Sequence, residues 1–470
     1  MSMEITATFT DLYQISMGHV YVSNGHHTQE ATFDYFFRKL PFNGGYVVFA
    51  GLYDLLETLK SFTFTDEEII FLEKQGFPKD YLRELEKFRF QGRIYSMQEG
   101  DLAFPYVPMV RVEGTIFEAQ LIETVLLNLL NFQSLIATKA ARVRQVAPGK
   151  ILMDFGLRRA QGLGAYHAAR ATIVGGFDAT SNVKAGLDFN IPVSGTMAHS
   201  FIQHFDDELS AFRSYAESRP QKCVLLVDTY NTLKSGVPNA ITVGKELEAR
   251  GQRLEGIRLD SGDLAYLSKH ARKMLDEAGL NYVKISASNQ LDENVIKSLL
   301  EQGAPIDIFG VGTNLVTGQP DAALDGVYKL CQSDGKPRIK LSESLSKTTL
   351  PGKKQVFRVF ENEHTLFGAD AIALSSEQRV DIMHHPFEPD NSMAFGALKQ
   401  EPLLSLVMQD GEVMVDKRDL KEIGAFSMKR LKSLPSEYKR FENPHTYKVG
   451  ISTALKEQRD DLRKQYLAKP

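Results

Sequence analysis

The sequence has few cysteines, little net charge and no uninterrupted apolar run long enough to span a membrane. Only Cys223 and Cys331 occur, far apart in the 470 residues, which excludes a disulfide framework and suits a reducing compartment. The formal net charge of -4 provides no polycation for nucleic acid or an anionic membrane, although a local cluster could still bind a small anion. The most apolar segment, LIETVLLNLLNFQSLI, is interrupted by polar residues and favours a buried helix over a membrane span.

The N-terminus also lacks a targeting signal. MSMEITATFTDLYQISM has neither the basic start nor the apolar stretch of a signal peptide. Apolar content of 43% and charged content of 24% are ordinary for a globular protein, and the length is enough for about two to four domains. We therefore expect a cytoplasmic protein with no nucleic-acid or membrane partner.

One pattern recurs between residues 151 and 313: an apolar, β-branched run that ends in glycine, a hydroxyl residue, Asp or Arg. The runs are ILMDFG, ATIVGG, IPVSGT, CVLLVDT, GIRLD, YVKISAS and IDIFGVGT, with helix-like sequence between them. Such runs predict a parallel sheet buried on both faces, in which ligands bind beyond the carboxyl ends of the strands. Seven candidates are one short of an eight-stranded barrel, so we expect an irregular, incomplete parallel α/β barrel.

The pattern of strand, helix and turn signals divides the chain into three segments. Residues 1–138 mix strand and helix signals and predict an additional mixed α+β domain. Residues 139–330 hold the repeated pattern and predict the barrel. Residues 331–470 are first turn-rich and then helical, which predicts a β-rich C-terminal extension with a helical tail that packs with the N-terminal domain. A long helix is predicted from about Glu118 to Val146.

Charged residues close two of the runs. GIRLDSGDL places Arg258 and Asp260 at a strand end, and CVLLVDT places Asp228 at another. Carboxylates can hold ribose hydroxyls or Mg²⁺, and an arginine fork binds a carboxylate or a phosphate. Helix capping would explain the Ser261 and Asp263 that follow, but not an Arg and an Asp together on an apolar strand. The sequence therefore predicts a polar floor formed by both strand ends.

Aromatic, hydroxyl and glycine residues close other runs. DFGLRRAQG supplies Phe155, whose face can stack on a flat ring, and Arg158 beside it. FGVGTNLVTG places Gly312 and Thr313 where backbone N–H groups can approach a phosphate. The basic stretch 347–354 predicts either a phosphate-contacting loop or a solvated turn.

GTMAHSF places Thr196 and His199 after a further run. A histidine here can act as an acid or base, bind a metal or accept a phosphoryl group. Taken alone, a histidine at a helix start is more often a structural hydrogen-bonding group. A metal is disfavoured because no second ligand lies at a usable spacing.

Together these segments resemble the nicotinate phosphoribosyltransferases, a type II phosphoribosyltransferase family of NAD salvage. The resemblance rests on the order and spacing of TDLYQISM, DFGLRRAQG, GGFDATSNV, GTMAHSF, LLVDTYNT, IRLDSGDL, FGVGTNLVTG and KLSESLSKTTLPGKKQVFR. It implies an enzyme that joins nicotinate to the ribose of 5-phosphoribosyl-1-diphosphate, giving nicotinate mononucleotide and diphosphate. It also implies Mg²⁺, and ATP as a co-substrate hydrolysed through a phosphohistidine.

The resemblance further implies roles for individual residues. His199 would be the phosphorylated histidine. Phe155 and Tyr13 would be the two aromatic walls around the pyridine ring, with Tyr13 supplied by the other subunit of a homodimer that shares its active sites. The remaining implied roles are nicotinate contacts for Thr196 and Arg258, a phosphate cradle from Gly312 and Thr313, a ribose-diphosphate and Mg²⁺ floor from Asp228 and Asp260, and a substrate-binding arginine at Arg158.

Two alternatives remain open. The relatives that act on nicotinamide carry an Asp in the segment matching GFDATSNV, where this chain has Ser181, and a neutral Ser tolerates a carboxylate substrate that Asp would repel. A catalytically silent phosphosugar-binding protein on the same fold would be expected to lose the histidine or the acidic floor, and this sequence retains both.

Overall fold

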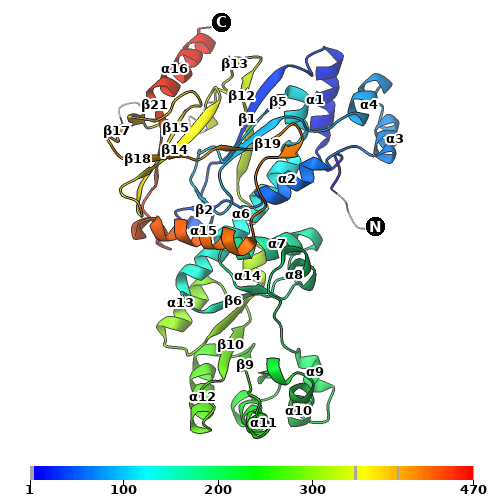
Figure 1. Ribbon diagram of the computed structural model, residues 1–470, viewed down its shortest axis with the longest axis vertical. Helices are drawn as coiled ribbons and strands as arrows, with labels where there is room; N and C mark the ends of the chain where they lie inside the picture. The colour runs from blue at the N-terminus through cyan, green and yellow to red at the C-terminus, as the bar shows by residue number, and fades with distance from the viewer. Residues whose placement is uncertain (1–4, 343–346, 389–390, 469–470) are drawn as a thin grey trace. The chain divides into compact units, whose positions relative to one another are not determined.

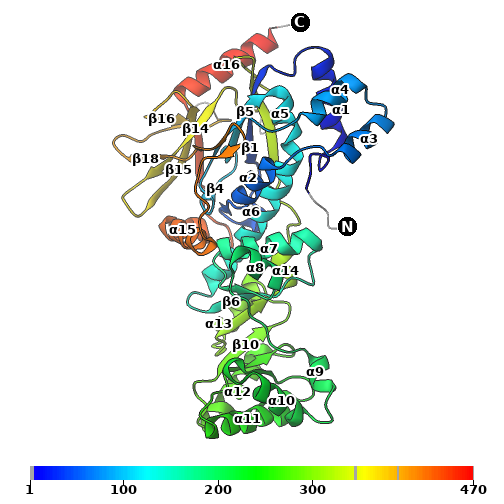
Figure 2. The same cartoon turned by 45° about the vertical axis from the view of Figure 1, so that its right-hand side comes forward.

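The computed structural model describes residues 5–342, 347–388 and 391–468 of the chain. Two units form in it: residues 1–135 with 323–470 make the first, and residues 136–322 make the second. The second unit is the part coloured in greens in Figures 1 and 2. The chain therefore begins in the first unit, builds the second, and returns to complete the first.

The second unit is built around a parallel sheet of six strands. In spatial order the strands are β7 (Ala179–Thr180), β6 (Ile151–Asp154), β11 (Ile308–Val311), β10 (Lys284–Ser288), β9 (Gly256–Leu259) and β8 (Val224–Leu226). Every neighbouring pair is parallel, so all carboxyl ends lie on one edge, which we call the carboxyl edge. The mixed α/β class with a parallel sheet is confirmed.

Helices connect these strands. They are α7 (Gly162–Val174), α8 (Val183–Phe189), α9 (His199–Gln203), α10 (Glu208–Ser218), α11 (Val237–Ala249), α12 (Leu264–Glu277), α13 (Glu293–Glu301) and α14 (Thr313–Val316). In Figures 1 and 2, α10, α11 and α12 lie side by side, and α12 packs on β9 and β10. A helical crossover returns the chain to the end of the sheet at which the previous strand began, so successive strands run parallel. A parallel order is also what the apolar sequences of these strands predicted.

Five of the seven predicted runs form strands, and ATIVGG does not. Its residues Ala171 to Val174 are the last turn of α7, all of them buried, and the helix ends at Gly175. A Cβ at Gly175 would lie 2.4 Å from the Ala137 carbonyl oxygen, so the glycine is needed for close helix packing. A helix buried on every side has the same apolar texture as a buried strand, which is why the prediction was wrong.

IPVSGT also fails to form a strand of its own. Val193 makes only an isolated parallel bridge with Thr180, and Pro192 lacks the N–H that a ladder needs. The strand at this edge of the sheet is instead the two-residue β7, too short to leave a periodic signal in the sequence.

The first unit contains two larger sheets. One has the order β13 (Lys336–Pro337), β12 (Gly326–Ser333), β1 (Glu30–Phe37), β5 (Val110–Thr115), β3 (Arg93–Ser96), β19 (Ser405–Gln409) and β20 (Glu412–Val413). The other has the order β17 (Ser392–Ala394), β16 (Ile382–His384), β21 (Lys448–Ser452), β15 (Leu366–Leu374), β14 (Lys354–Phe360) and β18 (Lys399–Pro402). A two-stranded ribbon pairs β2 (Val47–Val48) with β4 (Leu102–Ala103). Segments from both ends of the chain therefore share the first sheet.

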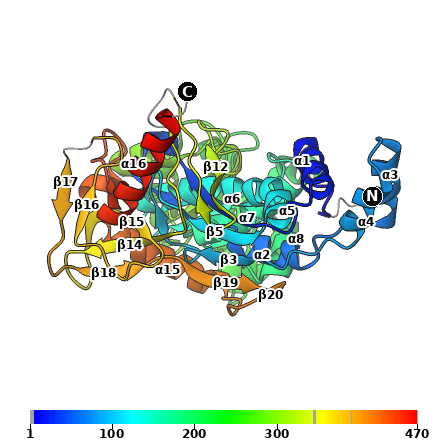
Figure 3. The same ribbon diagram turned by 90° about the horizontal axis from the view of Figure 1, so that it is seen from above.

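Helices cover these sheets. They are α1 (Leu12–Ser23), α2 (Leu52–Lys60), α3 (Asp66–Lys74), α4 (Lys79–Glu86), α5 (Ile116–Leu121), α15 (Leu420–Ser433) and α16 (Thr453–Leu467). Figure 3 shows α16 crossing the sheet that contains β15 and β16. The predicted long helix is confirmed as α5 and α6 (Glu123–Val146), with a break at Ile122. Of the helices that the structure describes, none has both the length and the apolar character needed to span a lipid bilayer.

A buried arginine joins the N-terminal and C-terminal parts of the first unit. The Arg358 side chain is fully buried; its guanidinium pairs with Asp370 at 2.8 Å and also with Asp101, and it donates to the Leu102 carbonyl at 2.6 Å. Tyr447 donates to the same Asp370 carboxylate at 2.8 Å. Removing one partner from such a network leaves uncompensated buried charge.

Arg358→Ala is therefore expected to lower the free energy of unfolding by about 3–5 kcal/mol. The matched control is Arg379→Ala, which removes the exposed pair with Asp381 and is expected to cost less than about 1 kcal/mol. Urea unfolding followed by circular dichroism measures both. Equal effects of the two substitutions would contradict the structural role of Arg358.

Candidate functional site

The carboxyl edge of the second unit gathers most of the predicted site residues. The members that follow or end a strand are Phe155 after β6, Ser181 after β7, Asp228 beyond β8, Arg258 and Asp260 at the end of β9, and Gly312 with Thr313 between β11 and α14. Thr196 and His199 lie on the chain that leads into α9. The parallel sheet thus brings together residues up to about 160 positions apart in sequence.

Arg258 is held in one orientation by several partners. Its side chain is 14% exposed, and Nη2 lies 3.1 Å from Asp260 Oδ1. Nη1 donates to Thr196 Oγ1 at 3.0 Å, and Nε donates to Ser288 Oγ at 2.9 Å. The guanidinium carbon lies 5.6 Å from the centre of the Phe155 ring. A fixed cation beside an aromatic face is suited to a flat, anionic ligand.

Asp228 fixes the backbone that carries Asp260. Its Oδ2 accepts hydrogen bonds from the Asp260 N–H at 2.8 Å and from Ser261 Oγ at 2.6 Å. Its Oδ1 is buried and has no hydrogen-bond partner among the described residues. A buried carboxylate oxygen without a partner is costly unless a ligand satisfies it. This oxygen is therefore the first candidate in the site for a cation ligand.

His199 is the first residue of α9 and is partly open, with 39% of its side chain exposed. Its Nδ1 lies 3.0 Å from Thr229 Oγ1, and its Nε2 lies 3.8 Å from Asp260 Oδ2. Among the described residues, no group of three or more His, Cys, Asp or Glu side chains is arranged to hold a metal ion. A cation here would need ligands from a substrate as well as from the two carboxylates, which is usual for Mg²⁺.

The Phe155 ring rests directly against β11. A Cβ added to Gly310 would lie 2.3 Å from Phe155 Cδ2, so only glycine leaves room for the ring. The Phe155 N–H donates to the Val311 carbonyl at 2.9 Å. The half-buried ring is therefore held at its backbone and along one edge.

Asp154 supports the turn that follows Phe155. Its carboxylate accepts from the Gly156 N–H at 2.8 Å and from Thr180 Oγ1 at 2.7 Å, and its carbonyl accepts from the Ser181 N–H at 2.8 Å. Burial of this side chain raises the pKa of Asp154 above its usual value of 3.8. Asp154 was not among the residues predicted from the sequence, although its position next to Phe155 in DFG was a usable signal.

Two further predicted site residues are Arg158 and Tyr13. Arg158 is exposed on the turn after Phe155. Tyr13 belongs to the first unit, where it is 48% exposed on α1. Burial, together with the charges of Glu123 and Asp11, raises the pKa of Tyr13 to about 12, so its phenol stays neutral near pH 7 and can serve as a flat, uncharged surface.

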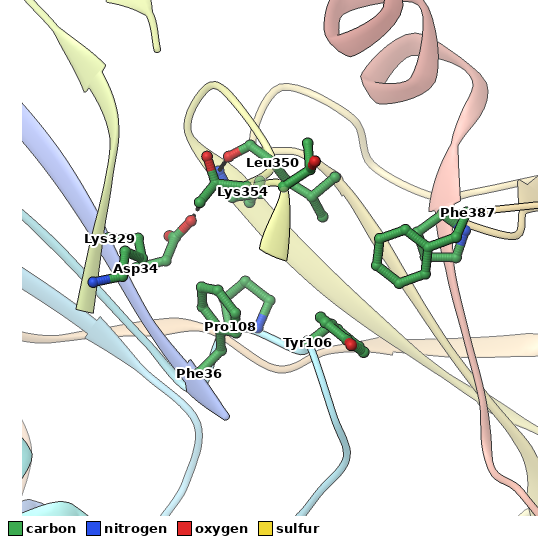
Figure 4. Close-up of a pocket in the computed structure, with 11 residues that line it drawn as sticks. Asp34, Phe36, Tyr106, Pro108, Lys329, Leu350, Lys354 and Phe387 are labelled. Atoms are coloured by element: carbon green, nitrogen blue, oxygen red, sulfur yellow. Dashed lines mark hydrogen bonds and ion pairs between the residues drawn. The ribbon is translucent and has the colours of Figure 1, made fainter. Parts of the chain in front are cut away.

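The basic stretch 347–354 is mainly structural where the structure describes it. Lys354 is buried and pairs with Asp34 at 2.8 Å, and Lys353 pairs with Glu113 at 2.8 Å. Figure 4 shows Lys354 and Asp34 facing each other beside a small cavity of about 20 Å³ in the first unit. These two lysines are committed to ion pairs, so neither of the two alternatives for the stretch, a phosphate-contacting loop or a solvated turn, describes them. Residues 343–346 of the matching segment lie outside the described residues.

Comparison with known proteins decides the family. Models of the nicotinate phosphoribosyltransferase N-terminal domain, the family itself and the C-terminal domain match residues 8–131, 151–364 and 353–459. The Bacillus subtilis nicotinate phosphoribosyltransferase is 47% identical over 455 residues, covering 94% of this chain and 92% of the relative. A Mycobacterium tuberculosis nicotinate phosphoribosyltransferase is 40% identical, covering 96% and 92%.

The chain belongs to the nicotinate phosphoribosyltransferase family. The crystal structure of human nicotinic acid phosphoribosyltransferase agrees, with a TM-score of 0.86 at 31% identity over 96% of this chain and 99% of that one. The chain is therefore an enzyme of the phosphoribosyltransferase class, as the sequence predicted.

The raised pKa of Asp154 predicts a pH dependence of stability. Between 3.8 and its folded pKa, the folded chain keeps a proton that the unfolded chain releases, so the free energy of unfolding falls as pH rises through this window. Asp154→Asn removes this contribution while keeping the geometry, since the amide can accept from Gly156 and donate to Thr180. Urea unfolding at about pH 4 and about pH 7 should show the variant gaining stability relative to the parent as pH rises. Parallel pH profiles would contradict this role.

Proposed function

We propose that the carboxyl edge of the second unit joins nicotinate to the ribose of 5-phosphoribosyl-1-diphosphate, in NAD biosynthesis. The single observation that carries the proposal is the ordered Arg258 next to the Phe155 ring and the two carboxylates of Asp228 and Asp260. Each part of that cluster matches one part of the two substrates.

Nicotinate is a flat ring with a carboxylate. The ring would stack on Phe155, and its carboxylate would meet the guanidinium of Arg258, which Thr196 already orients at 3.0 Å. Ser181 follows β7 and carries no charge to repel that carboxylate. The arrangement therefore favours the acid over nicotinamide.

The reaction needs little proton transfer. The pyridine nitrogen uses its own lone pair to form the bond to ribose C1, while the C1–oxygen bond breaks and its electrons leave with diphosphate. No general base is required, so the protein contributes positioning and electrostatic stabilisation. Gly312 and Thr313, at the start of α14, would hold the 5-phosphate by backbone N–H groups and a hydroxyl, and the exposed Arg158 would bind a substrate anion.

The acidic floor fits Mg²⁺. The unpartnered Oδ1 of Asp228 and the Oδ2 of Asp260 are the oxygens available to it, and two carboxylates plus phosphate oxygens are a usual ligand set for this ion. When bound, Mg²⁺ would neutralise charge on the departing diphosphate. Asp228 would also keep Asp260 in place through the backbone hydrogen bond between them.

His199 is proposed to accept the phosphoryl group of ATP. Thr229 occupies Nδ1, so Nε2, which faces Asp260 Oδ2 at 3.8 Å, is the nitrogen left for phosphorylation. A phosphoryl group adds roughly -1.5 to -2 charge. Placed next to Asp260, it would repel that carboxylate and change the charge presented to the substrates. This coupling would link ATP hydrolysis to substrate capture.

A homodimer is proposed to complete the site. Tyr13 would come from the other subunit as the second aromatic wall. Its helix α1 also exposes Leu12 by 65% and Val20 by 56%, and α8 of the second unit exposes Val183 and Leu187. Exposed apolar helix faces of this kind are typical of surfaces that become buried on association.

The architecture is proposed to be an incomplete barrel. The six parallel strands end at β7 on one side and β8 on the other. We further propose that segments 1–138, 139–330 and 331–470 act as an N-terminal mixed domain, a catalytic core and a C-terminal extension.

His199→Ala is expected to abolish ATP stimulation and to raise the KM for 5-phosphoribosyl-1-diphosphate by roughly tenfold or more, because phosphorylation can no longer change the site. Product formation from nicotinate with and without ATP measures the effect, and mass analysis locates phosphate on the parent. His204→Ala, at the opposite end of the same short helix, is the control and should keep the ATP stimulation. Unchanged ATP stimulation in His199→Ala would reject the phosphohistidine.

Nicotinamide in place of nicotinate is expected to give a much lower kcat/KM.

Gly310→Ala is expected to push the Phe155 ring out of place, because the new Cβ would lie 2.3 Å from the ring. The kcat/KM for nicotinate should fall by about ten- to a hundredfold, while the KM for 5-phosphoribosyl-1-diphosphate changes little. Phe155→Leu, which removes the ring without a clash, should show the same selective loss. A loss with Gly310→Ala alone would mean that the ring is not the nicotinate wall.

A further inference from the structure

A buried hydroxyl lies between the two charged groups of β9. Ser288 is the last residue of the neighbouring strand β10 and is 3% exposed. Its Oγ lies 2.9 Å from Arg258 Nε and is also hydrogen-bonded to Asp260 Oδ1. A guanidinium can only donate, so Ser288 must accept from Arg258, and its single proton is then directed to Asp260.

This hydrogen bond divides the two oxygens of Asp260 between different neighbours. Oδ1 is taken by Ser288 and by Arg258 Nη2 at 3.1 Å, whereas Oδ2 lies 3.8 Å from His199 Nε2. An arginine fork pairs most strongly when two of its nitrogens meet both oxygens of one carboxylate. With Nε committed to Ser288 and Nη1 committed to Thr196, Arg258 does not make that symmetric pair, and Oδ2 stays on the His199 side.

The backbone after Ser288 is strained. Asn289 has φ 89° and Gln290 has φ 43°, two successive non-glycine residues in the left-handed region. Such a residue costs about 1–3 kcal/mol and persists only where its surroundings enforce it. Asn314 supplies part of that enforcement, because its Nδ2 donates to the carbonyls of Gln290 at 3.3 Å and Leu291 at 3.4 Å.

The strained turn therefore connects two parts of the site. Asn314 is the second residue of α14, directly after Thr313 and close to Gly312. Ser288 is thus fixed from one side by β10 and from the other by the helix start proposed to hold the 5-phosphate. Backbone strain of this kind often occurs beside functional sites, where it holds a side chain in place.

We propose that Ser288 is a positioning residue of the reaction. It orients Arg258 toward nicotinate and keeps Asp260 Oδ2 available on the side of His199, and Asn314 holds it there through the turn. The inference rests on the proposed roles of Arg258, Asp260 and His199. Ser288 itself touches neither the reacting atoms nor the phosphoryl group.

The test compares Ser288→Ala with Ser288→Thr, which keeps the hydroxyl. Ser286→Ala is the matched control, because Ser286 lies on the same face of β10 and is also buried. Ser288→Ala is expected to lower kcat/KM for nicotinate by roughly tenfold or more and to raise the amount of ATP hydrolysed per nicotinate mononucleotide formed. Ser288→Thr should recover most of both quantities, and Ser286→Ala should match the parent.

A purely structural role would lower the amount of active enzyme without changing the ratio of ATP hydrolysed to product, so this ratio separates the two explanations. Asn314→Ala is a second variant that leaves Ser288 in place and should show the same changes at smaller size. Equal losses in Ser288→Ala and Ser286→Ala, or an unchanged kcat/KM and ratio in both Ser288→Ala and Asn314→Ala, would overturn the inference. A parent enzyme without ATP stimulation would reject the phosphohistidine instead, and kcat/KM for nicotinate would still decide the role of Ser288.

Discussion

The candidate site depends on the hydrogen bonds and the ion pair that fix the guanidinium of Arg258 in one orientation. The guanidinium is fastened at three nitrogens to groups from different parts of the second unit: Thr196 from the chain before α9, Ser288 from β10 and Asp260 from β9 itself. A cation fixed in this way has little freedom to lose when a ligand arrives, so preorganisation rather than burial is its contribution to binding. Asp228 supports the arrangement indirectly, since it holds the backbone of Asp260.

A second arginine in the same chain differs from Arg258, the proposed nicotinate-binding residue, in how completely it is paired. Arg358 in the first unit is fully buried, and its paired carboxylates Asp101 and Asp370 leave it no capacity for a ligand. Arg258 has one carboxylate partner and keeps 14% of its side chain exposed. Lys354 follows the first pattern, with Asp34 and backbone carbonyls around a buried ammonium group. The candidate site is thus distinguished by a cation that is incompletely paired and partly exposed at the end of a strand.

Much of this arrangement could be predicted from the sequence, because it follows from where strands end. Arg258, Asp260, Asp228 and Phe155 close apolar runs, and parallel strands bring their ends to one edge. The supporting residues carried weaker signals. Ser288 and Thr229 are small hydroxyl residues whose roles depend on register between neighbouring strands, which periodicity does not specify.

The differences between the expectations and the structure have related causes. ATIVGG was assigned to a strand because a fully buried helix and a fully buried strand both have continuous apolar sequences. Their backbone conformations differ, but the apolar pattern does not reveal which one forms. The lysines at 353 and 354 looked available for a phosphate because their partners, Glu113 and Asp34, come from strands more than two hundred residues earlier. Pairing over such distances is a property of the folded first unit and leaves no local pattern.

The charge balance of the cluster explains why the proposed reaction needs more than these residues. In the part of the chain that the structure describes, this cluster sets two carboxylates, Asp228 and Asp260, against the guanidinium of Arg258, which makes the potential unfavourable for an anion. Both proposed substrates are anions, and a phosphorylated His199 would add negative charge within a few ångströms of Asp260. The repulsion between like charges a few ångströms apart exceeds the attraction that stacking on one aromatic ring provides. The acidic floor therefore fits the proposed reaction if cations arrive with the substrates, which supports the proposal that Mg²⁺ binds the two carboxylates and that Arg258 binds the nicotinate carboxylate.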